Sequence, residues 1–491
     1  MAAALSGWFQ VRSSPGSVRE RIYYDSFDGR LYAAGLTLSY EPGWLTLAQR
    51  AGAGEPTRLA LAAEPVTPLR LAALPPGSLL DRLTAVVAPR ALLETARIQL
   101  TASSIAVLDE LDKTVVRLQT LASPGLRGRL QVTGLRGYER ELWQVLELLA
   151  APGGFETSAE PLADAAVRAG GGDPAGMRVA VEIPLAGDQP ADEAVQRICE
   201  RLLAVIDANL PGVLADIDVE FLHDFRVSLR RTRAVVRELR GVFPERRWLE
   251  LRNELRWLQL TTGTTRDLDV YLDEFEDLRM IAPEQLRPDL EPLFEVLARR
   301  RLQARREMLR SLRGERERRL LAGWRGLIAV LPELPTDDRP NAKAPIGALS
   351  AGRILKLHRR IVRMGRAIEP DSDPQAYHDL RKQGKELRYL LELFGRPLHE
   401  PEVVRTLVRS LKELQEVLGR HQDREVQIAT LSALAESVAA EPGGARAVLA
   451  MGVLIERLEA QAAAARIEFH ERFIEFASSA QRRLVRETFR A

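Results

Sequence analysis

The chain has 491 residues, of which 46% are hydrophobic and 28% are charged. This length suits two or three domains with separate cores, and the composition is ordinary for a soluble globular protein. The net charge is only +2 and Cys199 is the single cysteine, which excludes a uniformly basic surface and an internal disulfide.

The N-terminus has no signal-peptide pattern, and no run of about 18 uncharged apolar residues occurs, so we expect a cytoplasmic protein without a membrane span.

The first 150 residues are predicted to form an antiparallel, strand-rich α+β domain. Apolar and polar residues alternate over 18–50, with turn pairs at Asp28-Gly29 and Pro42-Gly43. Further strands are predicted at 92–108, 113–121 and 128–134, followed by a helix at 137–150.

The remainder of the chain is predicted to be a linker and an all-α domain. Residues 151–175 are rich in Gly, Ala, Pro and Asp, and we assign 151–190 as a flexible linker. From about residue 192 the apolar period is helical, and the Pro and Gly breaks leave roughly eight to ten helices within 191–491.

The helical part repeats itself. His223, Arg226, Arg230 and Arg233 are matched by His378, Arg381, Lys385 and Arg388, each at an offset of 155 residues. The next helix repeats at an offset of 156, where Leu255, Arg256, Gly263 and Asp267 match Leu411, Lys412, Gly419 and Asp423. A match in both charged and core positions indicates two similar helical units, 192–330 and 346–482.

The repeated cations are predicted to line one face of each helix. Residues 223, 226, 230 and 233 are spaced by 3, 4 and 3, so they form one stripe, which Arg237 extends. Successive members lie roughly 5 Å apart along the axis. A linear polyphosphate presents its charges in the same way, and arginine suits bidentate contact with phosphate oxygens.

A second observation favours an anion as the partner of these stripes. The helix from Arg353 to Arg366 carries six basic residues and no acidic one, and Lys356, Arg360 and Arg363 fall on one face. Like charges at this spacing destabilise an isolated helix, so such a face usually has an anion to meet. The alternative is that each stripe is simply a solvated face, and that the two histidines serve helix packing or helix starts. Metal binding by the histidines lacks the ligand spacing of zinc sites.

The repeated segments resemble the CHAD domain, the conserved histidine alpha-helical domain. The resemblance rests on HDFRVSLRRTRAVVREL (223–239), GTTRDLDV (263–270), HDLRKQGKELRYLLELF (378–394) and GRHQDREV (419–426). It implies two pseudo-symmetric four-helix bundles around a basic central groove, inorganic polyphosphate as the partner, and association with polyphosphate granules. Where the first copy has Arg266 the second has Gln422, and Glu392 stands opposite Arg237, so we expect the second half-site to be slightly weaker.

The stripes and the resemblance together give a set of candidate polyphosphate-binding residues. They are His223, Arg226, Arg230, Arg233, Arg237, Arg256, Lys356, Arg359, Arg360, Arg363, His378, Arg381, Lys382, Lys385, Arg388 and Lys412. We expect no catalytic residue, no metal ligand and no cofactor. The oligomeric state stays open.

Residues 1–150 resemble the CYTH domain, the triphosphate tunnel fold, through YYDSFDGRLYAAGLTLSYEPGWLTLAQR (23–50). The family's Glu-x-Glu-x-Lys strand is absent from GWFQVRSS (7–14), its basic strand positions are Thr37, Ser39 and Ala48, and its late acidic strand is LQVT (130–133). Without such carboxylates nothing holds Mg²⁺ against a triphosphate. The resemblance therefore implies a degenerate domain, with Arg50 and Arg97 as its remnants.

We therefore predict a non-enzymatic polyphosphate-binding protein. The alternatives are an active inorganic triphosphatase with a polyphosphate-targeting domain, and a nucleic-acid-binding protein. The low aromatic content of 5% argues against stacking on single strands.

Overall fold

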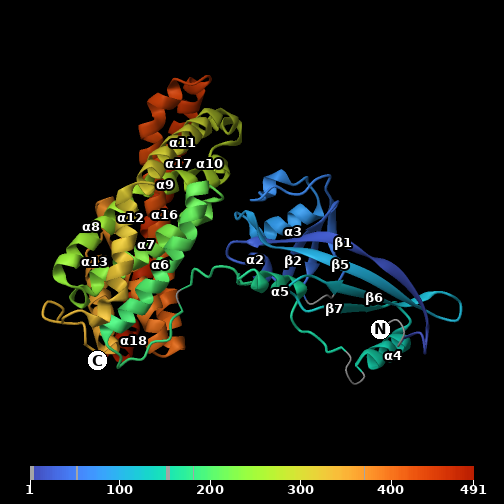
Figure 1. Ribbon diagram of the computed structural model, residues 1–491. Coiled ribbons are helices and arrows are strands. Elements are labelled where there is room, and N and C mark those ends of the chain that lie inside the picture. The colour runs from blue at the N-terminus through green and yellow to red at the C-terminus, as the bar shows by residue number, and fades with distance from the viewer. Residues whose placement is uncertain (1–4, 51–53, 151–154, 181, 370, 491) are drawn as a thin grey trace. The chain divides into compact units, whose positions relative to one another are not determined.

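The computed structural model describes residues 5–50, 54–150, 155–180, 182–369 and 371–490. The chain divides into two compact units, Met1–Arg178 and Val179–Ala491, shown in Figure 1. Over the described ranges no helix has both the length and the apolar character needed to cross a membrane.

The first unit is built on a seven-stranded antiparallel sheet with the order β4-β3-β2-β1-β5-β6-β7. Its strands are β1 (Gln10–Ser26), β2 (Leu36–Glu41), β3 (Trp44–Gln49), β4 (Thr57–Ala60), β5 (Leu92–Leu108), β6 (Thr114–Ala122) and β7 (Arg129–Gly134). Its helices are α2 (Arg30–Ala33), η1 (Leu71–Ala73), α3 (Ser78–Val87), α4 (Glu139–Ala150) and α5 (Leu162–Ala169). The antiparallel, strand-rich character predicted from the sequence is confirmed, whereas β4, α3 and α5 were not predicted.

Strand β1 supplies side chains to both faces of the sheet. Ile22 and Tyr24 lie in a buried cluster with residues of β2, β3 and α3, while Tyr23 between them packs against Ala163 and Ala166 of α5. Successive side chains of a strand point to opposite faces, so the alternation seen in the sequence builds two layers of core. Figure 1 shows α3 and α5 on either side of the long β1–β5 pair.

Part of the segment predicted to be a linker belongs to the first unit. Besides α5, the backbone N–H of Met177 donates to the carbonyl of Phe27 at 2.9 Å. Gly29 has a φ of 68°, and a Cβ atom there would meet the Ala175 carbonyl oxygen at 2.1 Å, so this close approach requires glycine. Residues 151–154, which the prediction also assigned to the linker, lie outside the described residues.

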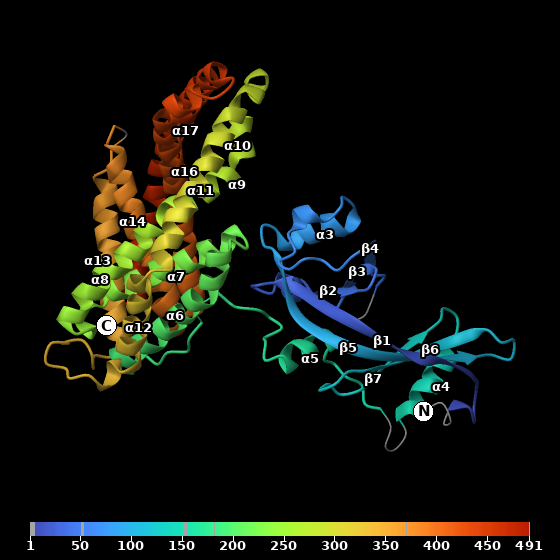
Figure 2. The same cartoon turned by 45° about the horizontal axis from the view of Figure 1, so that its top comes forward.

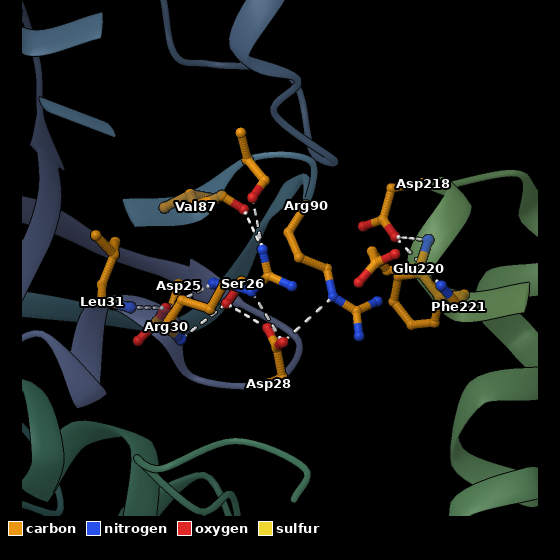
Figure 3. Close-up of polar contacts among 11 residues, drawn as sticks. Asp25, Ser26, Asp28, Arg30, Leu31, Val87, Arg90, Asp218, Glu220 and Phe221 are labelled. Carbon is orange, nitrogen blue, oxygen red and sulfur yellow. Dashed lines mark hydrogen bonds and ion pairs between the residues drawn. The ribbon is translucent and has the colours of Figure 1, made fainter. Parts of the chain in front are cut away.

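A polar turn fixes the chain after β1. The Asp25 carboxylate accepts from the backbone N–H of Leu31 at 2.9 Å, as Figure 3 shows. It also accepts from the backbone N–H of Tyr32 at 2.9 Å. The Arg30 guanidinium pairs with Asp28 and donates to the Val87 carbonyl at 3.0 Å. These bonds connect the β1–α2 turn to the end of α3.

The second unit is all-helical, as predicted. Its longer helices are α6 (Ala191–Ala215), α7 (Val219–Glu238), α8 (Glu245–Thr261), α9 (Gly263–Asp273), α11 (Glu291–Leu312), α12 (Glu315–Ala329), α13 (Ile346–Arg366), α14 (Pro374–Leu390), α16 (Pro401–Ala439), α17 (Gly444–Phe476) and α18 (Ser479–Thr488). Shorter elements are η2 (Arg240–Val242), α10 (Phe275–Ile281), η3 (Glu284–Leu286), η4 (Pro288–Leu290), η5 (Leu331–Glu333), the π-helix η6 (Leu391–Gly395) and α15 (Arg396–Leu398).

The offset between the two sequence copies recurs in the positions of these helices. Helix α6 begins at Ala191 and α13 at Ile346, so their starts are separated by the same offset as His223 and His378. The pair α8–α9 corresponds to the single helix α16, because the first copy is interrupted at Thr262 while α16 continues through the same place.

The two copies also bond to each other at equivalent positions. Pro190 and Pro345, which immediately precede α6 and α13, face each other in an antiparallel bridge. The N–H of Ala191 donates to the Ala344 carbonyl at 2.9 Å, and the N–H of Ile346 donates to the Gln189 carbonyl at 3.0 Å. The repeat offset carries Ala191 onto Ile346 and Gln189 onto Ala344, so each bond is the counterpart of the other. We refer to this pair of bonds as the reciprocal bridge.

Away from this bridge, a buried cluster joins α9, α10 and α11 to α16 and α17. It includes Phe275, Leu297, Leu434 and Leu454, each at most 2% exposed. Figure 2 shows α16 and α17 running side by side towards this end of the unit, which α10 and α11 complete. The cluster is separate from the helix faces that carry the repeated cations.

Candidate anion-binding site

The two basic stripes lie on helices α7 and α14, which pack against each other. Each helix begins with an aspartate cap. The Asp218 carboxylate accepts from the backbone N–H of Glu220 at 3.0 Å, as Figure 3 shows, and that of Asp373 accepts from Gln375 at 2.7 Å. Asp218 and Asp373 are themselves related by the repeat offset. Both helices therefore begin at equivalent residues of the two copies.

Between these helices the structure gathers a group of cations that we call the cationic array. Its members are near enough to one another for their charges to interact, and they come from α7, α8, α13 and α14. They are Arg226, Arg230, Arg233, Arg237, Arg252, Arg256, Arg360, Arg381, Lys385 and Arg388. Arg266 of α9 also interacts with Arg226, but it contacts His223 and is not counted in the array. The array therefore contains the arginines and the lysine of both predicted stripes, but not His223 or His378.

Arg226 is the most deeply buried member of the array, at 8% exposure. Its guanidinium donates to the Gln259 carbonyl at 2.7 Å and to the Thr262 hydroxyl at 2.8 Å. Burial, followed by the charge of Arg230, lowers its pKa to about 10, and the neighbouring Asp267 acts in the opposite direction. The protein itself thus uses two of this arginine's donors, both on Nη1, while its Nε is buried without a hydrogen-bond partner among the described residues.

Its counterpart, Arg381, is held less completely. A Cβ on Gly263 would lie 3.8 Å from the Arg226 guanidinium, and a Cβ on Gly419 would lie 3.8 Å from that of Arg381, so the two environments correspond. The position equivalent to Thr262 is Leu418, which has no hydroxyl to accept a bond. Arg381 is half-buried and its ion pair with Asp423 is 3.7 Å long. We therefore expect it to have more donors available for a ligand than Arg226.

Lys385 interacts with cations of both stripes. Burial lowers its pKa to about 7, and the positive charges of Arg381, Arg230 and Arg388 contribute to the shift. Arg230 reaches it from α7 and donates to the Tyr389 hydroxyl at 3.3 Å. A depressed lysine pKa is the expected result when several guanidiniums surround an ammonium group that is partly removed from water.

Arg233 and its neighbours extend the array along α7. Burial lowers the pKa of Arg233, and the charges of Arg237, Arg256 and Arg252 lower it further. Arg252 precedes Arg256 by four residues and lies on the same side of α8. The sequence prediction missed it, although its spacing from Arg256 could have revealed it.

Carboxylates of the protein hold part of the array. Arg237 pairs with Glu238 at 3.0 Å and also with Glu386 of α14. Arg388 lies 3.7 Å from Glu392, so these two cations are partly neutralised within the protein.

The remaining predicted cations have no carboxylate partner within salt-bridge distance among the described residues. They are Arg226, Arg230, Arg233, Arg256, Lys356, Arg359, Arg360, Arg363, Lys385 and Lys412; the ion pairs of their neighbours involve other side chains. Where these cations lie together in the array, mutual repulsion destabilises the protein, and an anion with several closely spaced charges would relieve it.

The two repeated histidines occupy matching positions at the ends of the stripes. Nδ1 of His223 lies 3.0 Å from the Arg266 guanidinium, and Nδ1 of His378 lies 2.5 Å from the Gln422 amide oxygen. Burial lowers the pKa of His378. Each histidine therefore contacts a side chain of a later helix, α9 or α16, and no local sequence pattern predicted this contact.

Several predicted residues lie outside the array. Lys356, Arg359, Arg363 and Lys412 are exposed, and no described contact joins them to it. Lys382 is exposed and pairs with Asp379 on its own helix at 3.2 Å. In the described chain no three His, Cys, Asp or Glu side chains are grouped as metal ligands would be.

A protein-family model, described as the CHAD domain, matches residues 197–432, which include the whole array. This part of the chain is a CHAD domain. A crystal structure of the CHAD domain from the plant Ricinus communis is similar in fold, with a TM-score of 0.50 and 25% identity; the match covers 60% of this chain and 95% of that one. The match to PptA from Streptomyces chartreusis has a TM-score of 0.45 and 18% identity, and covers 58% and 99% of the two chains.

Two uncharacterized proteins of Mycobacterium tuberculosis, from strains CDC 1551 and H37Rv, are also similar to this chain. Each is 26% identical over 272 residues. The match covers 54% of this chain, and the chain spans about half the length of these relatives, 49% in both cases.

Outside the CHAD domain, the two arginines predicted as remnants of a triphosphate site both pair with carboxylates. Arg50 pairs with the buried Asp164 of α5. Arg97 contacts Glu20 at 2.9 Å, Glu64 at 2.6 Å and Glu94 at 2.7 Å. The sequence prediction missed this acidic cluster because its members come from β1, β5 and a loop. The resemblance of the sheet to the CYTH fold stays a prediction.

Proposed function

We propose that the CHAD domain binds inorganic polyphosphate through the cationic array, without catalysing a reaction. The observation that carries this proposal is the set formed by Arg230, Arg233 and Lys385, which are half-buried beside other cations and have no carboxylate partner among the described side chains. Arginine and lysine at intervals of one helical turn can contact successive phosphates of a linear chain.

We further propose that the array joins two half-sites, one from each copy, in two pseudo-symmetric four-helix bundles. The equal offsets of α6 and α13, and the reciprocal bridge before them, support a local twofold relation. The likeness to the Ricinus communis CHAD domain supports the fold. A polyphosphate long enough to contact both stripes would bind more tightly than a short one, because both half-sites are already in place.

The location of the protein is part of the same proposal. We propose that the protein is cytoplasmic and that binding to polyphosphate holds it on polyphosphate granules. Co-sedimentation of the purified protein with polyphosphate granules, abolished by an array variant, would support this.

For the N-terminal unit, we propose a degenerate CYTH-like domain without triphosphatase activity. Arg50 and Arg97 already have carboxylate partners, so a triphosphate would have to displace Asp164 or the acidic cluster to reach them. Purified protein incubated with tripolyphosphate and Mg²⁺ or Mn²⁺ should release phosphate no faster than buffer. Turnover at ordinary enzyme rates would favour the alternative of an active triphosphatase.

The central test reverses charge within the array. Arg230→Glu and Arg381→Glu should each weaken the binding of labelled polyphosphate at low salt by about tenfold or more, since a hydrogen bond to a charged group contributes about 1.5–3 kcal/mol. Arg446→Glu makes the same charge change at an exposed position of α17, beside the separate apolar cluster, and should leave the affinity nearly unchanged. Far-ultraviolet circular dichroism checks that all three variants keep their helicity. Equal affinities in all three would refute the assigned site.

Competition with DNA distinguishes polyphosphate from nucleic acid. Tyr389, the aromatic residue beside Arg230, is 4% exposed and cannot stack on a base. Excess single-stranded DNA should therefore displace labelled polyphosphate poorly, and excess duplex DNA serves as the second competitor. Efficient displacement at moderate salt would favour a nucleic-acid-binding protein.

A further inference from the structure

Lys385 combines two properties that its ordinary role as a phosphate contact does not need. Arg381 and Arg388 lie four residues before it and three residues after it on α14, and Arg230 of α7 donates to the hydroxyl of Tyr389, one helical turn after Lys385, at 3.3 Å. These three guanidiniums can hold a phosphate group beside the amine. Lys385 is also half-buried, without a carboxylate partner among the described residues, so no ion pair keeps its ammonium form. An amine becomes nucleophilic when it loses its proton, and nearby cations favour that loss.

We propose that Lys385 is a site of acylation by small acyl phosphates. The neighbouring guanidiniums hold the phosphate group of the reagent, which brings the acyl carbon close to Nζ. The Nζ lone pair forms the new C–N bond, the bond between the acyl carbon and the phosphate oxygen breaks, and inorganic phosphate leaves with that electron pair. The amine proton passes to water, and the product is an uncharged amide.

Most of the charges that face Lys385 favour this step. Arg381 and Arg388 lie on its own helix and Arg230 faces it from α7, and all three lower its pKa, whereas Asp423, which faces it from α16, acts in the opposite direction. Together with burial they set its pKa at about 7, so about half of the side chain is neutral near pH 7. A lysine with the usual pKa of about 10.4 is neutral in roughly one molecule in 2,500 at that pH.

The composition of the chain makes the proposal easy to test. The protein has six lysines: Lys113, Lys343, Lys356, Lys382, Lys385 and Lys412. Lys382 lies on the same helix, has a 52% exposed side chain, and pairs with Asp379, so it is the matched internal control. Of these two lysines, exposure alone would favour Lys382, whereas the array favours Lys385.

The experiment treats the full chain with acetyl phosphate and measures the acetylation of each lysine by peptide mass spectrometry from pH 6 to pH 9.5. We expect Lys385 to react on the order of tenfold faster than Lys382 at pH 7, since its larger neutral fraction outweighs the weaker nucleophilicity of a less basic amine. Its rate should level off above about pH 8, while the rate at Lys382 continues to rise. Equal rates at the two lysines would overturn the proposal.

Recognition of the phosphate group is tested separately. Inorganic phosphate should slow the reaction of Lys385 with acetyl phosphate but not its reaction with uncharged N-hydroxysuccinimidyl acetate. Arg381→Gln should slow the first reaction at Lys385 more than the second. If phosphate and this variant affect both reagents equally, the guanidiniums do not hold the reagent and the proposal fails.

The consequence for binding rests on the proposed function. Lys385→Gln, which mimics the acetylated side chain, should weaken polyphosphate binding several-fold, and bound polyphosphate should protect Lys385 from acetylation. Preferential acetylation in a protein that binds no polyphosphate would overturn the proposed function and leave the acylation site standing. Polyphosphate binding without preferential acetylation would overturn the acylation site and leave the proposed function standing.

Discussion

Replacing Lys385 by methionine should stabilise the ligand-free helical unit near neutral pH. Its pKa falls from an ordinary value of 10.5 to about 7, a difference that corresponds to roughly 4–5 kcal/mol at about 1.4 kcal/mol per unit. This value is the maximum stabilisation, and partial exposure of the lysine and relaxation of the variant reduce it. We therefore expect a gain of about 1–3 kcal/mol in the free energy of unfolding at pH 7. Methionine keeps most of the aliphatic volume, so little packing is lost.

The sign of the pH dependence follows from proton counting. Between pH 7 and about 10.5 the unfolded chain binds a proton at Lys385 that the native chain mostly lacks, so the stability of the wild type rises with pH across this window. The variant lacks this contribution, and its advantage should shrink as the pH rises from 7 to 9.5. Guanidinium unfolding followed by circular dichroism at both pH values measures this, with Lys382→Met as the exposed control. A variant that is less stable at pH 7, or an advantage independent of pH, would refute the reasoning.

Two further predictions concern positions outside the array. Asp216, at a φ of 54°, pairs with Arg301 through bonds of 2.7 and 2.8 Å, and Asp216→Asn, which tolerates that backbone, should cost about 1–2 kcal/mol at pH 7 in urea unfolding. The pKa of Asp216 is lowered in the fold, so this difference is present above about pH 4 and should disappear as the pH falls further. In α13, Gly365→Ala would place a Cβ 2.1 Å from the Phe473 ring and should lower the melting temperature, at a cost of about 1–3 kcal/mol. Gly352→Ala on the same helix meets nothing within 4 Å and should be neutral or slightly stabilising, so a similar loss in both variants would show that Phe473 is not the cause.

The sequence predicted the parts of the fold and site that depend on spacing. Helical periodicity placed Arg226 and Arg230 on one face, and the constant offset between the two copies predicted an equivalent face on α14. Neither pattern could predict how deeply each arginine side chain is buried. Whether an arginine lies on the surface or is buried depends on what packs above it, and Arg226 is buried because α8 and the Thr262 turn fold over it. The expectation that the second half-site is weaker also considered only charge, whereas the loss of the Thr262 hydroxyl leaves Arg381 with more free donors.

In the first unit, too, local sequence patterns predicted some elements but not the contacts between distant residues. Alternating residues in 18–50 predicted strands, but the residues of α5 have the Ala- and Gly-rich surroundings of a linker and form a helix against Tyr23. Its Asp164 pairs with Arg50, 114 residues earlier in the chain. No local pattern reveals a contact across that distance, so the role of this segment could not be predicted from composition.

The reciprocal bridge has a consequence for how the protein could assemble its site. Each copy's first helix begins on the connecting segment of the other copy, so a polypeptide carrying one copy would have to recruit a second molecule to complete the same contacts. In the duplicated chain the two copies are permanently tethered, and their effective concentration is set by the connection, on the order of millimolar for short flexible linkers. Formation of the two-copy arrangement is therefore independent of how much protein the cell contains, and dilution does not dissociate it.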